Sequence, residues 1–151
     1  MYSWPTDRGE RVDFHLGSGR IVYDPERPGM KARTTYWCVV NTDNAIAAYY
    51  RWWVLRMYGV FLHQPAWGAH ISVIRGEKPQ DLSLWRKYQG ETVHFAYAHD
   101  VKQTGGNRPD GTPRPDNFWF VEVECPRLIE IRKELDLPTR FRLHMTIGRT
   151  N

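Results

Sequence analysis

Runs of β-branched and aromatic residues predict six strands along the chain. Such residues favour the pleated, half-buried surface of a sheet, and Gly, Pro, Asn and Asp bound the runs found here. The predicted strands cover residues 20–23, 34–40, 69–75, 92–98, 118–124 and 140–149.

Apolar residues at helical spacing predict two helices and a shorter third one. The first follows the capping side chains of residues 41–43 and runs to about Tyr58. The second begins at Pro126, a residue that suits a first helical turn, and runs to about Asp136. A short helix is expected over residues 82–88.

The order of these elements is β-β-α-β-(α)-β-β-α-β, with a helix before the strand at 69–75 and another before the strand at 140–149. This order predicts an α+β protein built from two similar halves. A length of 151 residues suits a single domain, 1–151, with a sizeable core. Hydrophobic residues make up 41% and aromatic residues 14%, which excludes disorder for the bulk of the chain.

A six-residue repeat lies on two of the predicted strands. HISVIR at 70–75 recurs as HMTIGR at 144–149, 74 residues later. Both copies read His, apolar, hydroxyl, apolar, any residue, Arg. Because alternate side chains of a strand share a face, the histidine and the hydroxyl of each copy lie together, and the apolar residues point to a core. On a regular strand, the final arginine falls on the opposite face from the histidine.

Each copy therefore places an imidazole beside a hydroxyl on a polar face. His70 lies beside Ser72, and His144 lies beside Thr146. A histidine can move a proton near neutral pH, and a hydroxyl can hold a phosphoryl oxygen. Two such pairs facing each other supply a general base, a general acid and two phosphate contacts without a metal ion.

The paired His-x-Ser/Thr strands resemble the 2H phosphoesterase superfamily, whose LigT-like members act on RNA ends and small nucleotides. The copy at 143–149 (LHMTIGR) looks especially like the C-terminal motif of the family. The resemblance implies a bilobal fold, with two pseudo-symmetric antiparallel sheets lining a central cleft and helices outside. It also implies cleavage of phosphodiesters or 2′,3′-cyclic phosphates without metal or cofactor. The catalytic residues carried over by this resemblance are His70, Ser72, His144 and Thr146.

Compact members of the family include bacteriophage anti-CBASS phosphodiesterases, which destroy cyclic oligonucleotide signals. The short chain and its aromatic content favour a cyclic oligonucleotide as substrate, with viral evasion of host immune signalling as the matching role. An RNA-end 2′,3′-cyclic phosphodiesterase or a 2′-5′ RNA processing enzyme is the first alternative. A non-catalytic nucleotide- or RNA-binding module is the second.

Aromatic and basic residues near the predicted site are candidates for substrate binding. Bases stack on aromatic side chains, although packing in the core is the alternative for each of them. The aromatic candidates are Trp67, Tyr97, His99 and Trp119. Arg108 and Arg114 belong to a Gly/Pro-rich stretch at 103–117, whose length suits a lid over an anionic ligand.

Charge and composition restrict the remaining possibilities. The formal net charge of +4 favours a phosphate-bearing partner. No apolar run is long enough for a membrane span, and the first ten residues do not form a signal peptide, so a cytoplasmic protein is expected, in the host cytoplasm if viral. Neither the other histidines nor the two cysteines show metal-ligand spacing, so no metal ion is expected, and no obligate protein partner is indicated.

Overall fold

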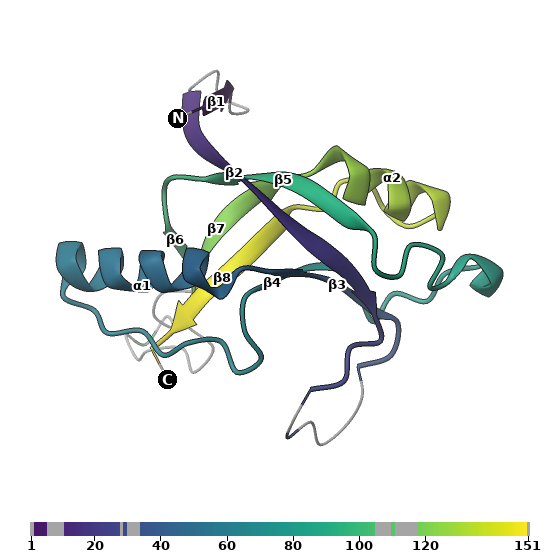
Figure 1. Cartoon of the computed structure of the whole chain (residues 1–151), viewed down its shortest axis with the longest axis horizontal. Coiled ribbons are helices and arrows are strands. Elements are labelled where there is room, and N and C mark those ends of the chain that lie inside the picture. Colours follow the sequence, from purple (N-terminus) through teal and green to yellow (C-terminus); the bar gives the residue numbers. More distant parts are fainter. Residues whose placement is uncertain are drawn as a thin grey trace.

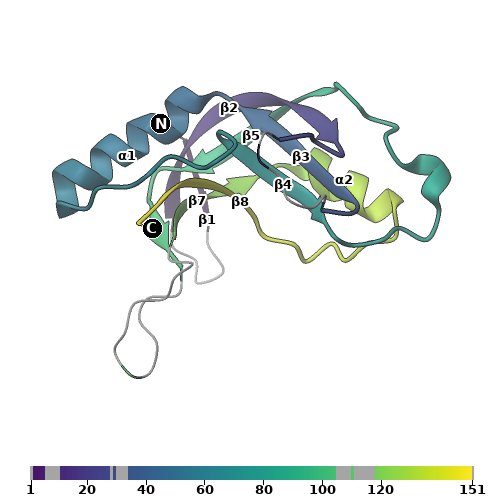
Figure 2. The same ribbon diagram turned by 90° about the horizontal axis from the view of Figure 1, so that it is seen from below.

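Six strands pair side by side into a closed ring. The computed structural model describes residues 2–5, 11–27, 29, 34–104, 110 and 118–150. The six strands are β2 (Arg11–Tyr23), β3 (Trp37–Thr42), β4 (His70–Arg75), β5 (Thr92–Ala98), β7 (Phe118–Glu124) and β8 (Leu143–Arg149). Antiparallel pairing runs in the order β2–β3–β4–β8–β7–β5 and returns from β5 to β2, which makes a β-barrel (Figures 1 and 2). Two short strands lie outside the ring, β1 (Tyr2–Pro5) against β2 and β6 (Lys102–Gln103) against β7.

The predicted fold class, a bilobal α+β fold with two pseudo-symmetric sheets lining a cleft, is wrong. The chain forms one closed barrel, and the reason lies in β2, which begins nine residues before the predicted strand at 20–23. Residues 19–23 of β2 pair with β3, and residues 14–20 pair with β5. The pairing of β4 with β8 already joins the two halves of the chain into one sheet, and the pairing of β2 with β5 closes that sheet into a barrel.

Two glycines allow β2 to pass from one neighbour to the other. A Cβ atom on Gly19 would lie 2.4 Å from the backbone oxygen of Asn41, and one on Gly17 would lie 2.9 Å from the ring of Phe95. Glycine inside a strand often marks such a bend or close approach of backbones. The prediction placed the start of the strand after both glycines and so missed the half of β2 that closes the barrel.

The two helices cover the two open ends of the barrel (Figures 1 and 2). Helix α1 (Asn44–Tyr58) lies where β5 and β8 end, and the Tyr50 hydroxyl donates a hydrogen bond to the Ala98 carbonyl oxygen (2.8 Å). Helix α2 (Pro126–Glu134) lies at the opposite end. In the part of the chain that the structure describes, neither helix has the length and apolar character needed to cross a bilayer.

The predicted helix at 82–88 is reduced to a single 3₁₀ turn, η1 (Leu82–Leu84). The turn stops because Trp85 is extended and Arg86 adopts a left-handed backbone conformation with a φ of 71°. By contrast, α1 follows its prediction, since the Asp43 carboxylate accepts a hydrogen bond from the Ala45 amide and Gly59 ends the helix with a φ of 67°.

The buried side chain of Arg132 ties α2 to the end of β4. Its exposed fraction is 1%, and its guanidinium donates hydrogen bonds to the Val73 carbonyl oxygen (2.8 Å) and to both carboxylate oxygens of Glu77 (2.7 and 2.8 Å). The Nε atom donates to the Pro138 carbonyl oxygen (2.8 Å). This side chain therefore satisfies two backbone carbonyls and one carboxylate at the α2 end of the barrel.

We expect Arg132→Met to lower the free energy of unfolding by about 2–4 kcal/mol, because it leaves these acceptors without their donor. Urea denaturation measures this change. Lys87→Met is the matched control, since it breaks the exposed Lys87–Glu134 ion pair and should change stability little. Equal losses in the two variants would contradict a structural role for Arg132.

Candidate active site

The two copies of the repeat lie on neighbouring strands. β4 and β8 are antiparallel, with Ile71 of the first copy opposite Met145 of the second. In an antiparallel pair, this register places each histidine across from the hydroxyl residue of the other copy. All four polar side chains line one pocket of about 240 Å³, namely His70, Ser72, His144 and Thr146.

The pocket lies on the outer surface of the barrel. Ile71, Val73, Met145 and Ile147 are fully buried in the core, as the repeat predicted, so the polar residues between them point outward. Residues 65–67, from the connection between α1 and β4, form one wall of the pocket. The site is therefore a hollow on the outer surface of the sheet. β4 from the first half of the chain and β8 from the second lie side by side beneath it.

A β-bulge interrupts the first copy of the repeat. In the pairing of β3 with β4, Cys38 is opposite Ile74 and Val39 is opposite Ser72, which leaves Val73 as an extra residue on β4. An extra residue in one strand shifts the alternation of its side chains by one position. The residues after the bulge therefore change face.

The second copy has a bulge at the equivalent position. In the pairing of β7 with β8, Trp119 is opposite Gly148 and Phe120 is opposite Thr146, which leaves Ile147 as the extra residue. The two extra residues are both the fourth member of the repeat. The internal similarity of the sequence thus extends to the backbone irregularity of the two strands.

These bulges bring Arg75 and Arg149 to the pocket. The argument from a regular strand placed both arginines on the face away from the histidines, and the structure corrects it, since both line the pocket. The guanidinium carbon of Arg75 also lies 5.8 Å from the centre of a ring of Trp37. Arginine ends both copies of the repeat, and this recurrence was the sequence signal for a shared role. The bulges explain how both arginines reach the pocket.

Both histidines are held by backbone carbonyl groups. The Nδ1 atom of His70 lies 3.1 Å from the Gly68 carbonyl oxygen. A carbonyl oxygen only accepts, so Nδ1 of neutral His70 carries the proton and Nε2 has a free lone pair. His144 bonds the backbone of Arg142, which also lies two residues before its histidine. Each imidazole is therefore held by the backbone two residues before it.

The surroundings favour the neutral form of each imidazole. Burial lowers the pKa of His70 and of His144 below the ordinary value of 6.5, although the bonds to backbone carbonyls act in the opposite sense. The positive charge of Arg75 lowers both pKa values further, and Arg27 and His144 add to the effect on His70. The protonated form of each imidazole therefore gives up its proton more readily than that of an ordinary histidine.

Aromatic rings surround the polar centre of the pocket. Trp37, Trp67 and Phe118 line it, and the rings of the two tryptophans are 6.1 Å apart at their centroids. Trp37 Nε1 also donates a long hydrogen bond to the Ser72 hydroxyl (3.4 Å). Trp67 was a sequence candidate, whereas Trp37 and Phe118 were not, because nothing in the local sequence of β3 or β7 connects them to the repeat.

The other three aromatic candidates lie away from this pocket. The ring of Tyr97 on β5 lies 5.4 Å from that of His15, and His15 Nε2 lies 3.1 Å from His99 Nδ1. Trp119 is 9% exposed and packs into the core, with its ring 5.7 Å from that of Tyr58. The structure therefore does not bring Tyr97, His99 or Trp119 together with the histidine pair.

The predicted basic lid falls outside the residues that the structure describes. Arg108 and Arg114 lie outside the described residues, as does most of the stretch at 103–117. Lys102, which directly precedes this stretch, forms an ion pair with Glu122 (2.9 Å).

No match is found when the chain is compared with protein-family models, with curated proteins or with solved structures. The geometry and chemistry of the pocket must therefore carry the functional argument. Over the described residues, no three His, Cys, Asp or Glu side chains gather closely enough to hold a metal ion.

We expect His70 and His144 to titrate below pH 6.5, since burial and Arg75 both disfavour their protonated forms. Arg75→Met should raise both pKa values, because it removes a positive charge near each ring. Titration followed by NMR of the imidazole signals measures these values, with Lys78→Met at an exposed position as the control. Values of 6.5 or above in the wild-type protein would contradict the environment described here.

Proposed function

We propose that the protein is a metal-independent phosphodiesterase of the 2H type, with His70 and His144 as its acid–base pair. The proposal rests on one observation, the meeting of both His-x-Ser/Thr motifs in a single pocket. Two imidazoles, two hydroxyls and two arginines gather there, and none of the described residues that line the pocket is Asp or Glu. Such a set suits an anionic substrate whose reaction requires proton transfer.

The reaction on a 3′,5′-phosphodiester follows from these groups. One histidine removes the proton from the ribose 2′-hydroxyl, and the 2′-oxygen attacks phosphorus. The bond from phosphorus to the 5′-oxygen breaks, and the other histidine donates a proton to that oxygen. The products are a 2′,3′-cyclic phosphate and a free 5′-hydroxyl. With a 2′,3′-cyclic phosphate as substrate, water takes the place of the 2′-hydroxyl.

We assign the base to His70 and the acid to His144. Three positive or ionisable neighbours disfavour protonation of His70, whereas Arg75 is the one such neighbour of His144. Two hydroxyls, one from each copy of the repeat, then hold the non-bridging oxygens as negative charge shifts in the transition state.

The two arginines extend the site beyond the scissile phosphate. Arg75 and Arg149 each lie three residues beyond the hydroxyl of their copy. Because β4 and β8 are antiparallel, this places the arginines toward opposite ends of the pocket. A strand advances about 3.3 Å per residue, so the two guanidinium groups flank the central phosphate instead of sharing it. Each can bind a phosphate neighbouring the one that is cleaved.

A cyclic oligonucleotide is the substrate that we propose for this site. A pocket of about 240 Å³ is smaller than the roughly 300–1,000 Å³ common for ligand sites, so it accommodates a phosphodiester and little more. Bases on either side would then stack on aromatic rings at the rim, such as Trp67. A cyclic oligonucleotide presents a phosphodiester with nucleosides and further phosphates on both sides. Destruction of such a signal by a viral protein would counter host immune signalling.

We expect His70→Ala and His144→Ala each to lower turnover roughly 10²–10⁴-fold, the usual effect of losing a positioned acid or base. Products from cyclic di- and trinucleotides, linear RNA and RNA ending in a 2′,3′-cyclic phosphate are resolved by mass, with EDTA present. His94→Ala is the control, since His94 is exposed on β5 and lies outside this pocket. Near-normal turnover by His144→Ala, or activity that returns only with a divalent metal, would contradict the proposal.

A second variant tests the flanking phosphate contact. We expect Arg149→Met to lower kcat/KM for a cyclic dinucleotide roughly 10–100-fold, the effect of one charged hydrogen bond, and to change it little for a nucleoside 2′,3′-cyclic phosphate. Steady-state kinetics on the two substrates measure this difference, with exposed Arg140→Met as the control. Equal losses on both substrates would show that Arg149 does not bind a neighbouring phosphate.

An RNA-end enzyme would behave differently in the same assays. Its affinity should rise with RNA length and fall steeply with salt, because each phosphate contact releases counterions. Turnover restricted to linear RNA would replace the cyclic substrate with RNA.

A further inference from the structure

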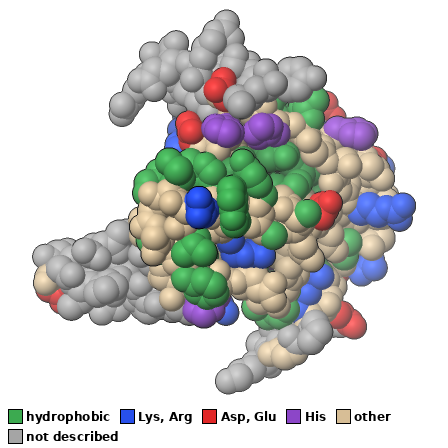
Figure 3. Space-filling model, turned by 60° about the vertical axis from the view of Figure 1, so that its left-hand side comes forward, with side chains coloured by type: hydrophobic (Ala, Val, Ile, Leu, Met, Phe, Trp, Pro, Cys, Tyr) green, Lys and Arg blue, Asp and Glu red, His purple; other side chains and the backbone are tan. Residues whose placement is uncertain are grey.

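Helix α1 carries a concentration of exposed hydrophobic side chains. Of eight exposed large hydrophobic residues in the described part of the chain, six lie between positions 49 and 61, with exposed fractions of 44–65%. We call these six residues the α1 patch: Tyr49, Trp52, Leu55, Met57, Tyr58 and Phe61. Figure 1 shows that α1 extends past the barrel, and Figure 3 shows hydrophobic side chains gathered on this side of the molecule, with arginine or lysine among them.

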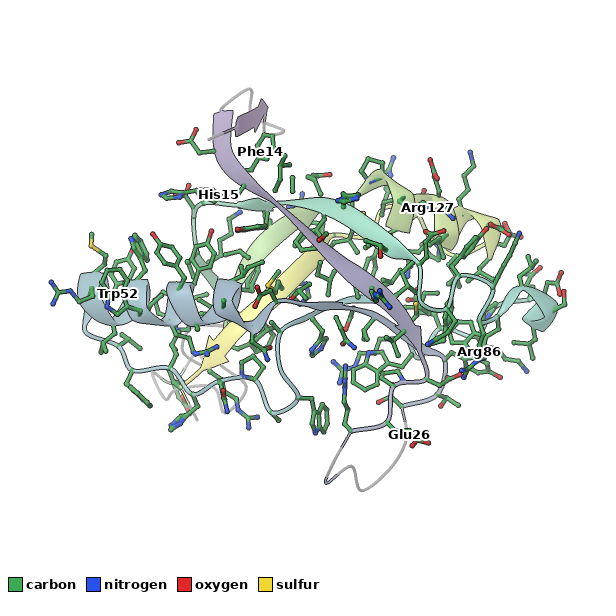
Figure 4. All side chains as sticks on the ribbon, viewed as in Figure 1. Phe14, His15, Glu26, Trp52, Arg86 and Arg127 are labelled. Carbon is green, nitrogen blue, oxygen red and sulfur yellow. The ribbon has the colours of Figure 1, made fainter. Side chains whose placement is uncertain are left out.

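The outer face of α1 is unusual for a surface helix. Such a helix normally presents charged and polar side chains to solvent. Here Ala45, Ala48, Tyr49 and Trp52 follow one another at helical spacing, and all are exposed. Figure 4 shows Trp52 near the outer end of the helix, away from the barrel. Arg56 completes this face as its one charged member.

The area of the α1 patch is suited to a protein interface. Side chains of this size present about 200 Å² each, so the six exposed fractions together amount to roughly 650 Å². The largest apolar patch of a typical monomer covers about 300–600 Å². A standard interface takes about 800 Å² from each partner, which the α1 patch approaches before Arg56 and the two alanines are counted.

The charges around the α1 patch limit what can cover it. No Asp or Glu occurs from position 44 to position 76. Of the two arginines in α1, Arg51 donates a hydrogen bond to the Ile147 carbonyl oxygen (2.8 Å), and Arg56 forms no ion pair within the described residues. In a contact between two copies of α1, Arg56 would therefore meet no carboxylate from this segment. It would instead meet exposed aromatic rings, which are good partners for a guanidinium group.

We propose that the α1 patch is the interface of a homodimer, in which two copies of α1 pack antiparallel about a two-fold axis beside Trp52. A contact of this symmetry places the same surface on both sides. With the axis beside Trp52, Tyr49 lies opposite Arg56 of the partner subunit, where the ring can receive the guanidinium. Ala48, beside Tyr49 on the same face, then also lies close to Arg56 of the partner subunit.

The α1 patch is also connected to the pocket. The ring of Phe61 lies 5.2 Å from that of His63. His63 exchanges two backbone hydrogen bonds with Arg149 (2.8 and 3.0 Å), and a Cβ atom on Gly148 would lie 2.8 Å from the His63 backbone oxygen. A dimer would therefore support the segment that walls the pocket. The proposal itself does not depend on the proposed activity.

Sedimentation equilibrium of the full chain over about 0.1–100 μM tests the dimer. Interfaces of this size have dissociation constants in the micromolar range or lower. We expect a monomer–dimer equilibrium, with the dissociation constant raised at least about 30-fold by Trp52→Glu and by Tyr49→Glu, because each places a carboxylate in an apolar contact. Both positions are exposed, so the circular dichroism of the folded monomer should be unchanged. Leu82→Glu, at an exposed leucine of η1, is the matched control and should leave the dimer intact.

Cross-linking tests the antiparallel arrangement. A mixture of Ala48→Cys and Arg56→Cys chains, both altered on the outer face of α1, should form a disulfide between the two variants more readily than either variant forms one with itself. The natural thiols of Cys38 and Cys125 are free but buried, so they should not interfere. A wild-type chain that is monomeric throughout the range, or a dimer that Trp52→Glu does not weaken, would overturn the proposal. Binding of a monomeric chain to anionic vesicles or RNA through Trp52 would also overturn it, by assigning the α1 patch to another partner.

Discussion

The antiparallel pairing of β4 with β8 is the contact on which the site depends. It joins the two copies of the repeat edge to edge, with Ile71 opposite Met145. From this one register, each histidine meets the hydroxyl of the other copy, and the apolar residues of both copies enter one core. The matched bulges at Val73 and Ile147 then turn Arg75 and Arg149 toward the same pocket. The register and the matched bulges therefore give the two copies of the repeat equivalent positions on the sheet.

The sequence predicted the individual elements better than their assembly. The strands at 92–98 and 118–124 and the helix that ends at Tyr58 are confirmed, because alternation, β-branched content and caps are local signals. Closure of the barrel depends on contacts between β2 and β5, which pair residues such as Phe14 and Ala98. No local pattern specifies that pairing, and Gly17 and Gly19 conceal the first half of β2 because glycine is uncommon inside strands.

The same distinction applies to the pocket. The four polar residues of the repeat could be found from the sequence, since their spacing on a strand decides their face. The arginines could not be placed, because a bulge arises from pairing with a neighbouring strand and reverses a rule that holds within one strand. Trp37 reaches the pocket from β3, and residues 65–67 reach it from the α1–β4 connection. Tyr97 and Trp119 flank the stretch at 103–117 in the sequence, yet neither lines the pocket.

The separation of β4 from β8 along the chain affects how the protein folds. Ile71 and Met145 are 74 residues apart, and barrels whose pairings are this distant fold slowly, in milliseconds to seconds. The four polar residues of the repeat lie in one pocket only after β4 and β8 have paired, so this pocket forms in the same step as that pairing. At a translation rate of about 5–20 residues per second, β4 leaves the ribosome several seconds before β8 is made. During that interval the edge of β4 that will receive β8 is an open strand edge, and it is exposed to mispairing with other chains.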